Sequence, residues 1–217
     1  MFCGIDLGTS SVKAAVYDEA GRTLACARRE CELVTPKAGW SELDPEDYLD
    51  KLYQVIREAS EDSGQRITAV AISSQAQAVL PIDENGKPLY NIIVTMDNRT
   101  IPQYMFWKKN YDEKEIYGRT GNTIGSIYTL NKIMWHKQNQ PEIYNRAWKF
   151  CCVQDYAAYM LTGEGPYTDY SIAGRTMMFS VKEPVWDEKV LGIAGIDIGK
   201  LSSPVPSVTV VGKIRTE

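Results

Sequence analysis

The chain has 217 residues, of which 44% are hydrophobic and 24% are charged, and its formal net charge is −4. This balance is typical of a soluble globular protein with a sizeable core, in one large domain or two small ones. It argues against nucleic acid or an anionic membrane as the main partner. The sequence also has no run of about eighteen apolar residues that would span a membrane.

The cysteines and the histidine limit the chemistry further. The five cysteines include no CxxC pair, which predicts reduced thiols and a cytoplasmic location. No secretory signal pattern is expected at the N-terminus. His136 is the only histidine, so the sequence offers few residues for a zinc site built on histidine or for a Ser-His-Asp triad.

The first seventeen residues predict a β-hairpin with an unusual tip. A short apolar strand, CGIDL, is followed by Gly-Thr-Ser-Ser and then by an alternating segment at 12–17. Glycine permits backbone conformations that other residues resist, and the hydroxyl residues add donors beside the backbone N–H groups. Such a tip can hold phosphate oxygens. The candidate phosphate-binding residues are Gly8, Thr9, Ser10, Ser11 and, as a neutralising charge, Lys13.

Asp6 stands at the end of the first strand, beside this tip. Mg²⁺ prefers oxygen ligands and is often shared between one or two carboxylates and substrate phosphates. Asp6 is therefore a candidate magnesium ligand and catalytic carboxylate. The alternative is an ordinary hairpin with turn residues at its tip, but the complete run DLGTSSVK directly after a strand favours phosphate binding. The run is neither a GxGxxG nor a GxxxxGK[ST] motif.

The next residues predict a third strand and a long helix. Residues 23–31 extend the hairpin into an antiparallel meander. Asp44 is a good N-cap, Pro45 suits the first helical position, and Gly64 ends an apolar pattern of helical spacing.

A second ligand-binding region is expected after the following strand. Residues 67–73 are dense in small and β-branched side chains, which predicts a strand buried on both faces. This strand ends in the polar patch 73–78, and ligands gather at the carboxyl ends of strands in open α/β sheets. A hairpin over 79–94 with its turn at 83–88 then delivers Asp97 to the same side.

The rest of the chain is more helical, and Asp169 lies in a further polar cluster near a helix start. The stretch 201–207 is rich in Pro and Ser and is linker-like. Helices are expected at 101–110, 129–138 and 154–161, and strands at 149–153, 176–181 and 208–211.

Taken together, six stretches resemble the N-terminal domain of the FGGY family of carbohydrate kinases, which includes xylulokinases, gluconokinases and glycerol kinases. They occur in family order, and the resemblance covers essentially the whole chain, residues 1–217. The six are GIDLGTSSVK at 4–13, GWSELDPEDY at 39–48, ISSQAQA at 72–78, MDNRT at 96–100, QDYAAYMLTGE at 154–164 and TDYSIAGRTMMFS at 168–180.

The resemblance implies a fold and an activity. The fold is the α/β, ribonuclease H-like domain of the actin, Hsp70 and sugar kinase ATPases, a mixed sheet with three antiparallel N-terminal strands and flanking helices. The activity is phosphorylation of a hydroxyl on a sugar, polyol or sugar acid, with ATP and Mg²⁺ as cofactors. The family's C-terminal domain, which binds adenosine and follows the general base, is absent from this sequence, so we expect a fragment that is inactive alone.

The resemblance also implies site residues. Asp6 matches the family's magnesium-associated carboxylate, and residues 8–11 match the loop that faces the γ-phosphate. Gln75 precedes the family's sugar-contacting pair, here Ala76 and Gln77. This pair is Arg-Glu in glycerol kinases and Met-His in xylulokinases, so it matches neither. Ile127 lies where glycerol kinases have a sugar-contacting tyrosine, which speaks against glycerol as the substrate.

Two carboxylates in family motifs have a structural alternative. Asp97 either contacts substrate, or pairs with Arg99 or caps the helix that follows Thr100. Asp169 either contacts substrate or caps the short turn at 170–172.

Two other functions remain as alternatives. One is a free-standing polyol-binding module, against which the phosphate loop argues. The other is an ATPase like actin or Hsp70. The stretches ISSQAQA, MDNRT and TDYSIAGRT argue against it, because those families lack them. Fold analogy alone could not decide between the two. Exposed apolar surface where the second domain would dock is expected to favour a homodimer.

Overall fold

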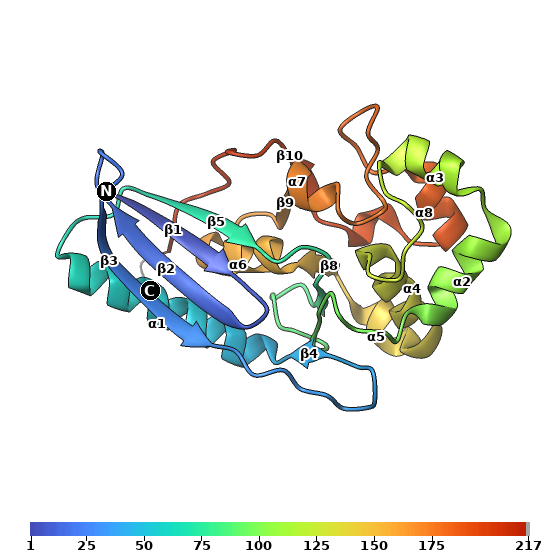
Figure 1. Ribbon diagram of the computed structural model, residues 1–217, viewed down its shortest axis with the longest axis horizontal. Coiled ribbons are helices and arrows are strands. Elements are labelled where there is room, and N and C mark those ends of the chain that lie inside the picture. The colour runs from blue at the N-terminus through green and yellow to red at the C-terminus, as the bar shows by residue number, and fades with distance from the viewer. Residues whose placement is uncertain (216–217) are drawn as a thin grey trace.

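The first three strands form the expected antiparallel meander, and a fourth strand joins it in parallel (Figure 1). The computed structural model describes residues 1–215, and residues 216–217 of the expected domain lie outside the described part. The order of this four-stranded sheet is β3-β2-β1-β5. Its strands are β1 (Phe2–Leu7), β2 (Ser11–Tyr17), β3 (Thr23–Glu30) and β5 (Ala69–Ser74).

Helix α1 (Pro45–Ser63) packs on one face of this sheet. It begins at Asp44, whose side chain accepts hydrogen bonds from two backbone N–H groups of the first turn, and it ends at Gly64 in the left-handed conformation. Leu52 and Val55 face the sheet and are buried. The predicted helix and both of its caps are confirmed.

The prediction that residues 67–73 are buried on both faces is wrong. Along β5 the residues alternate between exposed and half-buried, with Ala71 and Ser73 exposed. The reason is that the helix packed against β5, α6 (Val153–Thr162), covers one face of the strand, while the side chains on the opposite face are exposed. Small side chains leave a shallow depression on this open face, lined among others by Gly4, Asp6, Lys13, Ala15, Ala71 and Ser73.

A second, smaller sheet connects the two ends of the molecule, and its order is β4-β7-β6-β8. The antiparallel pairing of β6 with β7 confirms the hairpin predicted over 79–94. The strands are β4 (Glu42–Leu43), β6 (Val79–Ile82), β7 (Ile92–Ile93) and β8 (Lys149–Cys152).

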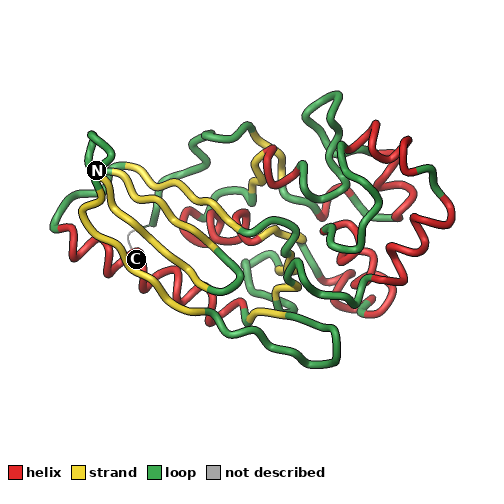
Figure 2. Tube along the Cα trace, in the orientation of Figure 1, coloured by secondary structure: helices red, strands yellow, loops and turns green. Residues whose placement is uncertain are grey.

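Most of the remaining helices gather at the end of the molecule away from the first sheet (Figures 1 and 2). The helices expected at 101–110, 129–138 and 154–161 are confirmed, while three short helices between and after them were not predicted from the apolar spacing. No helix in the described range 1–215 is both long and apolar enough to cross a membrane. The elements are α2 (Ile101–Asn110), α3 (Glu113–Thr120), α4 (Thr129–Asn139), α5 (Pro141–Arg146), α6 (Val153–Thr162), β9 (Tyr167–Asp169), α7 (Tyr170–Ala173), α8 (Glu188–Ala194), a 3₁₀ turn at Ile198–Lys200 and β10 (Ser203–Val205).

Two predicted strands near the C-terminus are wrong. Residues 176–181 form turns with a single bridge between Phe179 and Trp186, so Met177, Met178 and Phe179 are buried without a strand ladder. Residues 208–211 form no strand, and Val208 is fully exposed because no neighbouring strand lies beside it. The stretch 201–207 is packed at its start instead, since Leu201 is buried and β10 pairs in parallel with β9.

The apolar side chains form two separate clusters. The first cluster lies between the four-stranded sheet, α1 and α6, and includes Leu7, Val55 and Leu80. The second cluster lies among α2, α4, α5 and α8, and includes Trp107 and Ile133. The candidate ligand-binding segments lie where β1, β5 and β6 come together between these clusters.

Candidate functional site

The phosphate tip and the substrate turn lie side by side because β1 and β5 are parallel neighbours. We define the phosphate tip as residues 8–10 and the substrate turn as residues 75–77. The backbone N–H of Gln75 donates to the carbonyl of Leu7 at 2.8 Å. The Thr9 hydroxyl donates to the side-chain oxygen of Gln75, also at 2.8 Å. The structure thus brings together two groups of residues that lie about seventy positions apart in the sequence.

The phosphate tip is a tight turn that requires glycine. Gly8 donates its N–H to the carbonyl of Ser11 at 3.0 Å, and a Cβ on Gly8 would lie 2.9 Å from that same oxygen. The hydroxyl of Tyr48, on helix α1, donates to the carbonyl of Gly8 at 2.8 Å. Burial raises the pKa of that tyrosine. Ser10 is exposed, whereas Ser11 is buried as the first residue of β2.

Asp6 and Lys13 face each other across the hairpin on the open face of the first sheet. The Lys13 ammonium lies 2.9 Å from one carboxylate oxygen of Asp6, and both side chains are about half exposed. An exposed pair of this kind contributes little to stability, so either partner can turn to a ligand at low cost. Both residues therefore lie beside the phosphate tip, as predicted from the sequence.

Asp6 is a carboxylate that could hold a magnesium ion shared with phosphate. Among residues 1–215 no group of three or more His, Cys, Asp or Glu side chains forms a metal cage. A single carboxylate suffices for Mg²⁺, which usually keeps several waters and binds substrate phosphates in addition. Asp6 uses one oxygen for Lys13, and its other oxygen makes no hydrogen bond within the described chain.

The substrate turn is held by contacts from several elements. The Thr95 hydroxyl donates to the carbonyl of Ala76 at 2.7 Å. Gln77 has a φ of 64°, which is unusual for a residue with a side chain. Its side chain is nearly buried, and in the orientation that satisfies both ends of the amide it accepts a hydrogen bond from Arg175 at 2.9 Å. The ammonium of Lys132 donates to the carbonyl of Gln77 at 2.7 Å.

Asp97 lies in a buried cluster of charges and not on the surface of the site. Two nitrogens of Arg99 each donate to one of its oxygens at 2.8 Å, and the backbone N–H of Ser41 donates at 2.6 Å. Arg99 also donates to Glu42 at 2.6 Å and stacks on Trp40, with 3.8 Å between the guanidinium and the ring centre. The Asp97 side chain has no exposed surface, so the pairing alternative is the arrangement observed.

Asp169 occupies the N-cap of α7, which is the structural alternative expected for it. One oxygen accepts from the backbone N–H of Ile172 and from the Ser171 hydroxyl, both at 2.8 Å, and the other accepts from Ser207 at 3.2 Å. Partial burial acts to raise the pKa of Asp169, but these bonds and one from Gln154 lower it below the ordinary value. The carboxylate is only partly buried, so part of it is accessible to a ligand.

Sequence reasoning missed two cations next to the substrate turn. Lys132 interrupts the apolar pattern of α4, and Arg175 lies inside the stretch TDYSIAGRTMMFS. A lysine among apolar residues such as Leu130 and Ile133 is only a weak signal that its charged side chain is buried. No local pattern shows that it reaches a turn that precedes it by 55 residues.

Comparison with known proteins agrees with this arrangement. The model of the FGGY family of carbohydrate kinases, N-terminal domain, matches residues 1–217. The chain is 32% identical to a xylulose kinase of Lactococcus lactis over 99% of this chain and 43% of that protein. It is 33% identical to a glycerol kinase of Thermococcus gammatolerans, over 98% and 44%. It is 34% identical to a gluconokinase of Bacillus subtilis, over 95% and 40%.

Solved structures show the same fold. A gluconate kinase from Lactobacillus acidophilus superposes with a TM-score of 0.93 at 26% identity, over 99% of this chain and 44% of that one. A glycerol kinase of Plasmodium falciparum, solved with ADP, superposes with a TM-score of 0.92 at 28% identity, over 100% and 45%. The expected α/β fold of the sugar kinases is thereby confirmed.

The chain spans less than half the length of each of these relatives. The family match nevertheless extends over every residue from the phosphate tip to the C-terminus. The chain therefore belongs to the FGGY family of carbohydrate kinases, and it corresponds to their N-terminal domain.

Proposed function

We propose that the chain is the substrate- and phosphate-binding part of an ATP-dependent kinase that phosphorylates a hydroxyl of a sugar, polyol or sugar acid. The observation that carries this proposal is the hydrogen bond between Thr9 and Gln75, which joins the phosphate tip to the substrate turn. Phosphoryl transfer depends on placing the donor phosphate beside the accepting hydroxyl, together with charge stabilisation. Family membership supports the same proposal.

The phosphate side of the site has distinct roles for its residues. The N–H groups and hydroxyls of residues 8–10 would bind the transferring phosphate, and Ser11 would hold the turn from within β2. Lys13 would neutralise phosphate charge, while Asp6 would hold Mg²⁺ directly or through water. A magnesium ion held there would supply positive charge against the phosphates of ATP.

On the substrate side, Gln75 and Gln77 would orient the sugar hydroxyls, and Ala76 would leave room for a bulky or differently placed one. Asp169 would contact substrate with the part of its carboxylate that is exposed. Asp97 would act indirectly, because its bonds to Arg99 and Ser41 fix the loop that follows Thr95.

Activity is proposed to need more than this chain. The sequence covers 40–44% of the length of the relatives cited above. We therefore propose that a general base and the adenosine site come from residues outside this chain, and that the 217-residue chain alone does not turn over.

The competing functions are less well supported. A polyol-binding module would not need a glycine-dependent phosphate tip. An ATPase like actin or Hsp70 would not explain the match of the kinase family model over residues 1–217. A cytoplasmic location and a homodimer, the latter through exposed apolar side chains such as Met96, Ile101 and Met105, belong to the same proposal.

The test is a panel of D-xylulose, glycerol and gluconate, each added to the chain with Mg²⁺ and ATP. Saturation-transfer NMR reports sugar binding, and a coupled assay reports ADP. We expect one of the sugars to bind without ADP release, and Gln77→Leu to weaken that binding. ADP release that depends on sugar would contradict inactivity of the chain alone. Absence of both binding and release would contradict the proposed function.

A further inference from the structure

Lys132 is a fully buried lysine that the proposed chemistry does not use. It lies in the first turn of α4, and no carboxylate within the described residues is close enough to form an ion pair with it. Burial lowers its pKa to about 7, against the opposing effect of the Asp97 charge. Lysine is rarely buried without a partner, because taking its charge out of water is costly.

The Lys132 ammonium ties together two segments that are distant in sequence. It donates to the carbonyl of Gln77 at 2.7 Å and to the carbonyl of Ile127 at 2.9 Å. Gln77 belongs to the substrate turn, and Ile127, which is 37% exposed, lies in the loop that precedes α4. A lysine carries three donors on a flexible stem, so one residue can hold both carbonyls at once.

The conformation of Gln77 needs such support. A φ of 64° is disfavoured for any residue with a Cβ, and it persists only where neighbouring groups hold it. Three side chains meet this need: Thr95 binds the carbonyl of Ala76, Arg175 binds the Gln77 amide, and Lys132 binds the Gln77 carbonyl. Arg175 also lies over the ring of Tyr128 in the loop before α4, with 5.9 Å to the ring centre. Among the described residues, Lys132 is the one of these three that also donates a hydrogen bond to that loop.

We propose that Lys132 is a positioning residue that sets the backbone of the substrate turn and its distance from the loop at Ile127. This inference rests on the proposed function in so far as the turn binds a sugar. Lys132 acts through the Gln77 and Ile127 carbonyls and contacts neither sugar nor phosphate. Its removal therefore weakens sugar binding and leaves the phosphate tip at Gly8–Ser10 unchanged.

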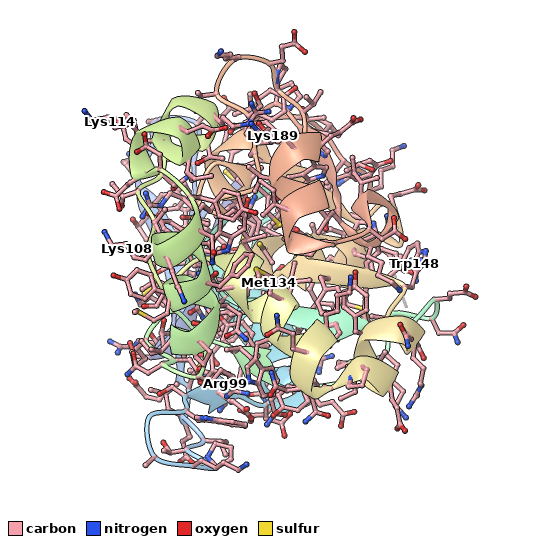
Figure 3. All side chains as sticks on the ribbon, turned by 90° about the vertical axis from the view of Figure 1, so that its right-hand side faces the viewer. Arg99, Lys108, Lys114, Met134, Trp148 and Lys189 are labelled. Atoms are coloured by element: carbon pink, nitrogen blue, oxygen red, sulfur yellow. The ribbon has the colours of Figure 1, made fainter. Side chains whose placement is uncertain are left out.

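A purely structural role makes a different prediction. If Lys132 only stabilised the fold, its loss would resemble the loss of any buried side chain on α4. Met134 provides the matched control, because it is buried on the same helix and contacts Trp107 in the second cluster. It lies in the interior between the helices in Figure 3.

The experiment compares Lys132→Met and Met134→Ala with the unaltered chain. Hydrogen exchange followed by mass spectrometry is read in the peptides spanning 74–80, 124–128 and 8–13. Calorimetry measures the dissociation constant of whichever of D-xylulose, glycerol or gluconate the unaltered chain binds. If Lys132→Met does not fold, Lys132→Gln keeps a donor on a shorter stem and carries the same comparison.

We expect Lys132→Met to speed exchange in 74–80 and 124–128 but not in 8–13, and to raise the sugar dissociation constant about tenfold, as for a lost bond from a charged donor. Met134→Ala should instead speed exchange in the peptides of α2 and α4. Unchanged exchange in 74–80, or the same pattern in both variants, would overturn the inference. If none of the sugars binds the unaltered chain, the proposed function fails, while the exchange pattern still decides the role of Lys132.

Discussion

The hydroxyl of Thr9 donates to the side-chain oxygen of Gln75 at 2.8 Å, across 66 positions of sequence. A hydroxyl can donate only one hydrogen bond. If Thr9 donates this bond to a phosphate, its bond to the Gln75 side chain must break. The two halves of the site therefore compete for one donor. Arrival of the phosphate would free Gln75 to turn to the sugar.

The role of this bond can be tested with Thr9→Val, and Thr9→Ser serves as the control because it keeps the hydroxyl. We expect valine to lower the free energy of unfolding by about 1 kcal/mol, the typical contribution of a hydrogen bond. We also expect it to shift the side-chain amide signals of Gln75 in a ¹H–¹⁵N NMR spectrum. Serine should leave both nearly unchanged. Equal spectra for the two variants would show that the bond does not exist in solution.

The buried charges around Arg99 predict a large loss of stability for one substitution. Arg99→Met would leave the carboxylates of Asp97 and Glu42 buried without their partner, which costs about 3–5 kcal/mol in comparable cases. Urea unfolding measures the change. The control is Lys189→Ala, because Lys189 pairs with Glu115 at the surface. That variant should unfold at the same urea concentration as the unaltered chain.

Two buried groups predict opposite effects of pH on stability. Burial raises the pKa of Asp155 to about 7, so the folded chain keeps a proton that the unfolded chain has lost, and stability falls as the pH rises from about 4 to 7. Burial, with Arg99 nearby, lowers the pKa of His136 to about 3. The folded chain then lacks a proton that the unfolded chain binds, and stability rises with pH up to about 6.5.

These two effects should cancel between pH 4 and 6.5, and single variants should reveal them. In His136→Phe, which suits the aromatic surroundings of Tyr90, Trp135 and Phe150, stability should fall by about 1.4 kcal/mol per pH unit. In Asp155→Asn it should rise by about the same amount per unit. Urea unfolding over this pH range provides the measurement, and parallel pH profiles for the two variants would contradict the prediction.

Asp169 can be tested for a second role beyond its cap. Asp169→Ala should lower the free energy of unfolding by about 1 kcal/mol through loss of the N-cap, while Asp169→Asn should retain most of the stability. If the carboxylate also contacts the sugar, Asp169→Asn should weaken sugar binding in calorimetry without this loss of stability. Unaltered sugar binding in Asp169→Asn would restrict the residue to capping.

Local signals predicted much of the fold. The caps at Asp44 and Gly64 bound α1 correctly, since they depend only on the residues next to them. The phosphate tip and the substrate turn were also predicted to lie at strand ends, because polar residues follow apolar runs there. Their contact through Thr9 follows from the parallel pairing of β1 and β5, which the sequence pattern alone does not specify.

What remained unpredicted depends on contacts between distant residues. The burial of Asp97 arises because Arg99 is enclosed by Trp40 and Glu42 from an earlier segment. The burial of Lys132 depends on the substrate turn, which lies 55 residues earlier in the sequence. The apolar run at 208–211 has the composition of a strand, but a strand also needs a neighbour, and Val208 has none among the described residues.

Strand β6 forms a wall between the two clusters, because Ala78 and Leu80 belong to the first cluster and Val79 to the second. Adding or deleting one residue just before Ala78 would turn the strand over and exchange these faces. Related genes that acquire a new substrate should therefore substitute side chains at 76 and 77 while conserving the number of residues between β5 and β6. During evolution the segment between β5 and β6 can therefore change its side chains, but it cannot change its length.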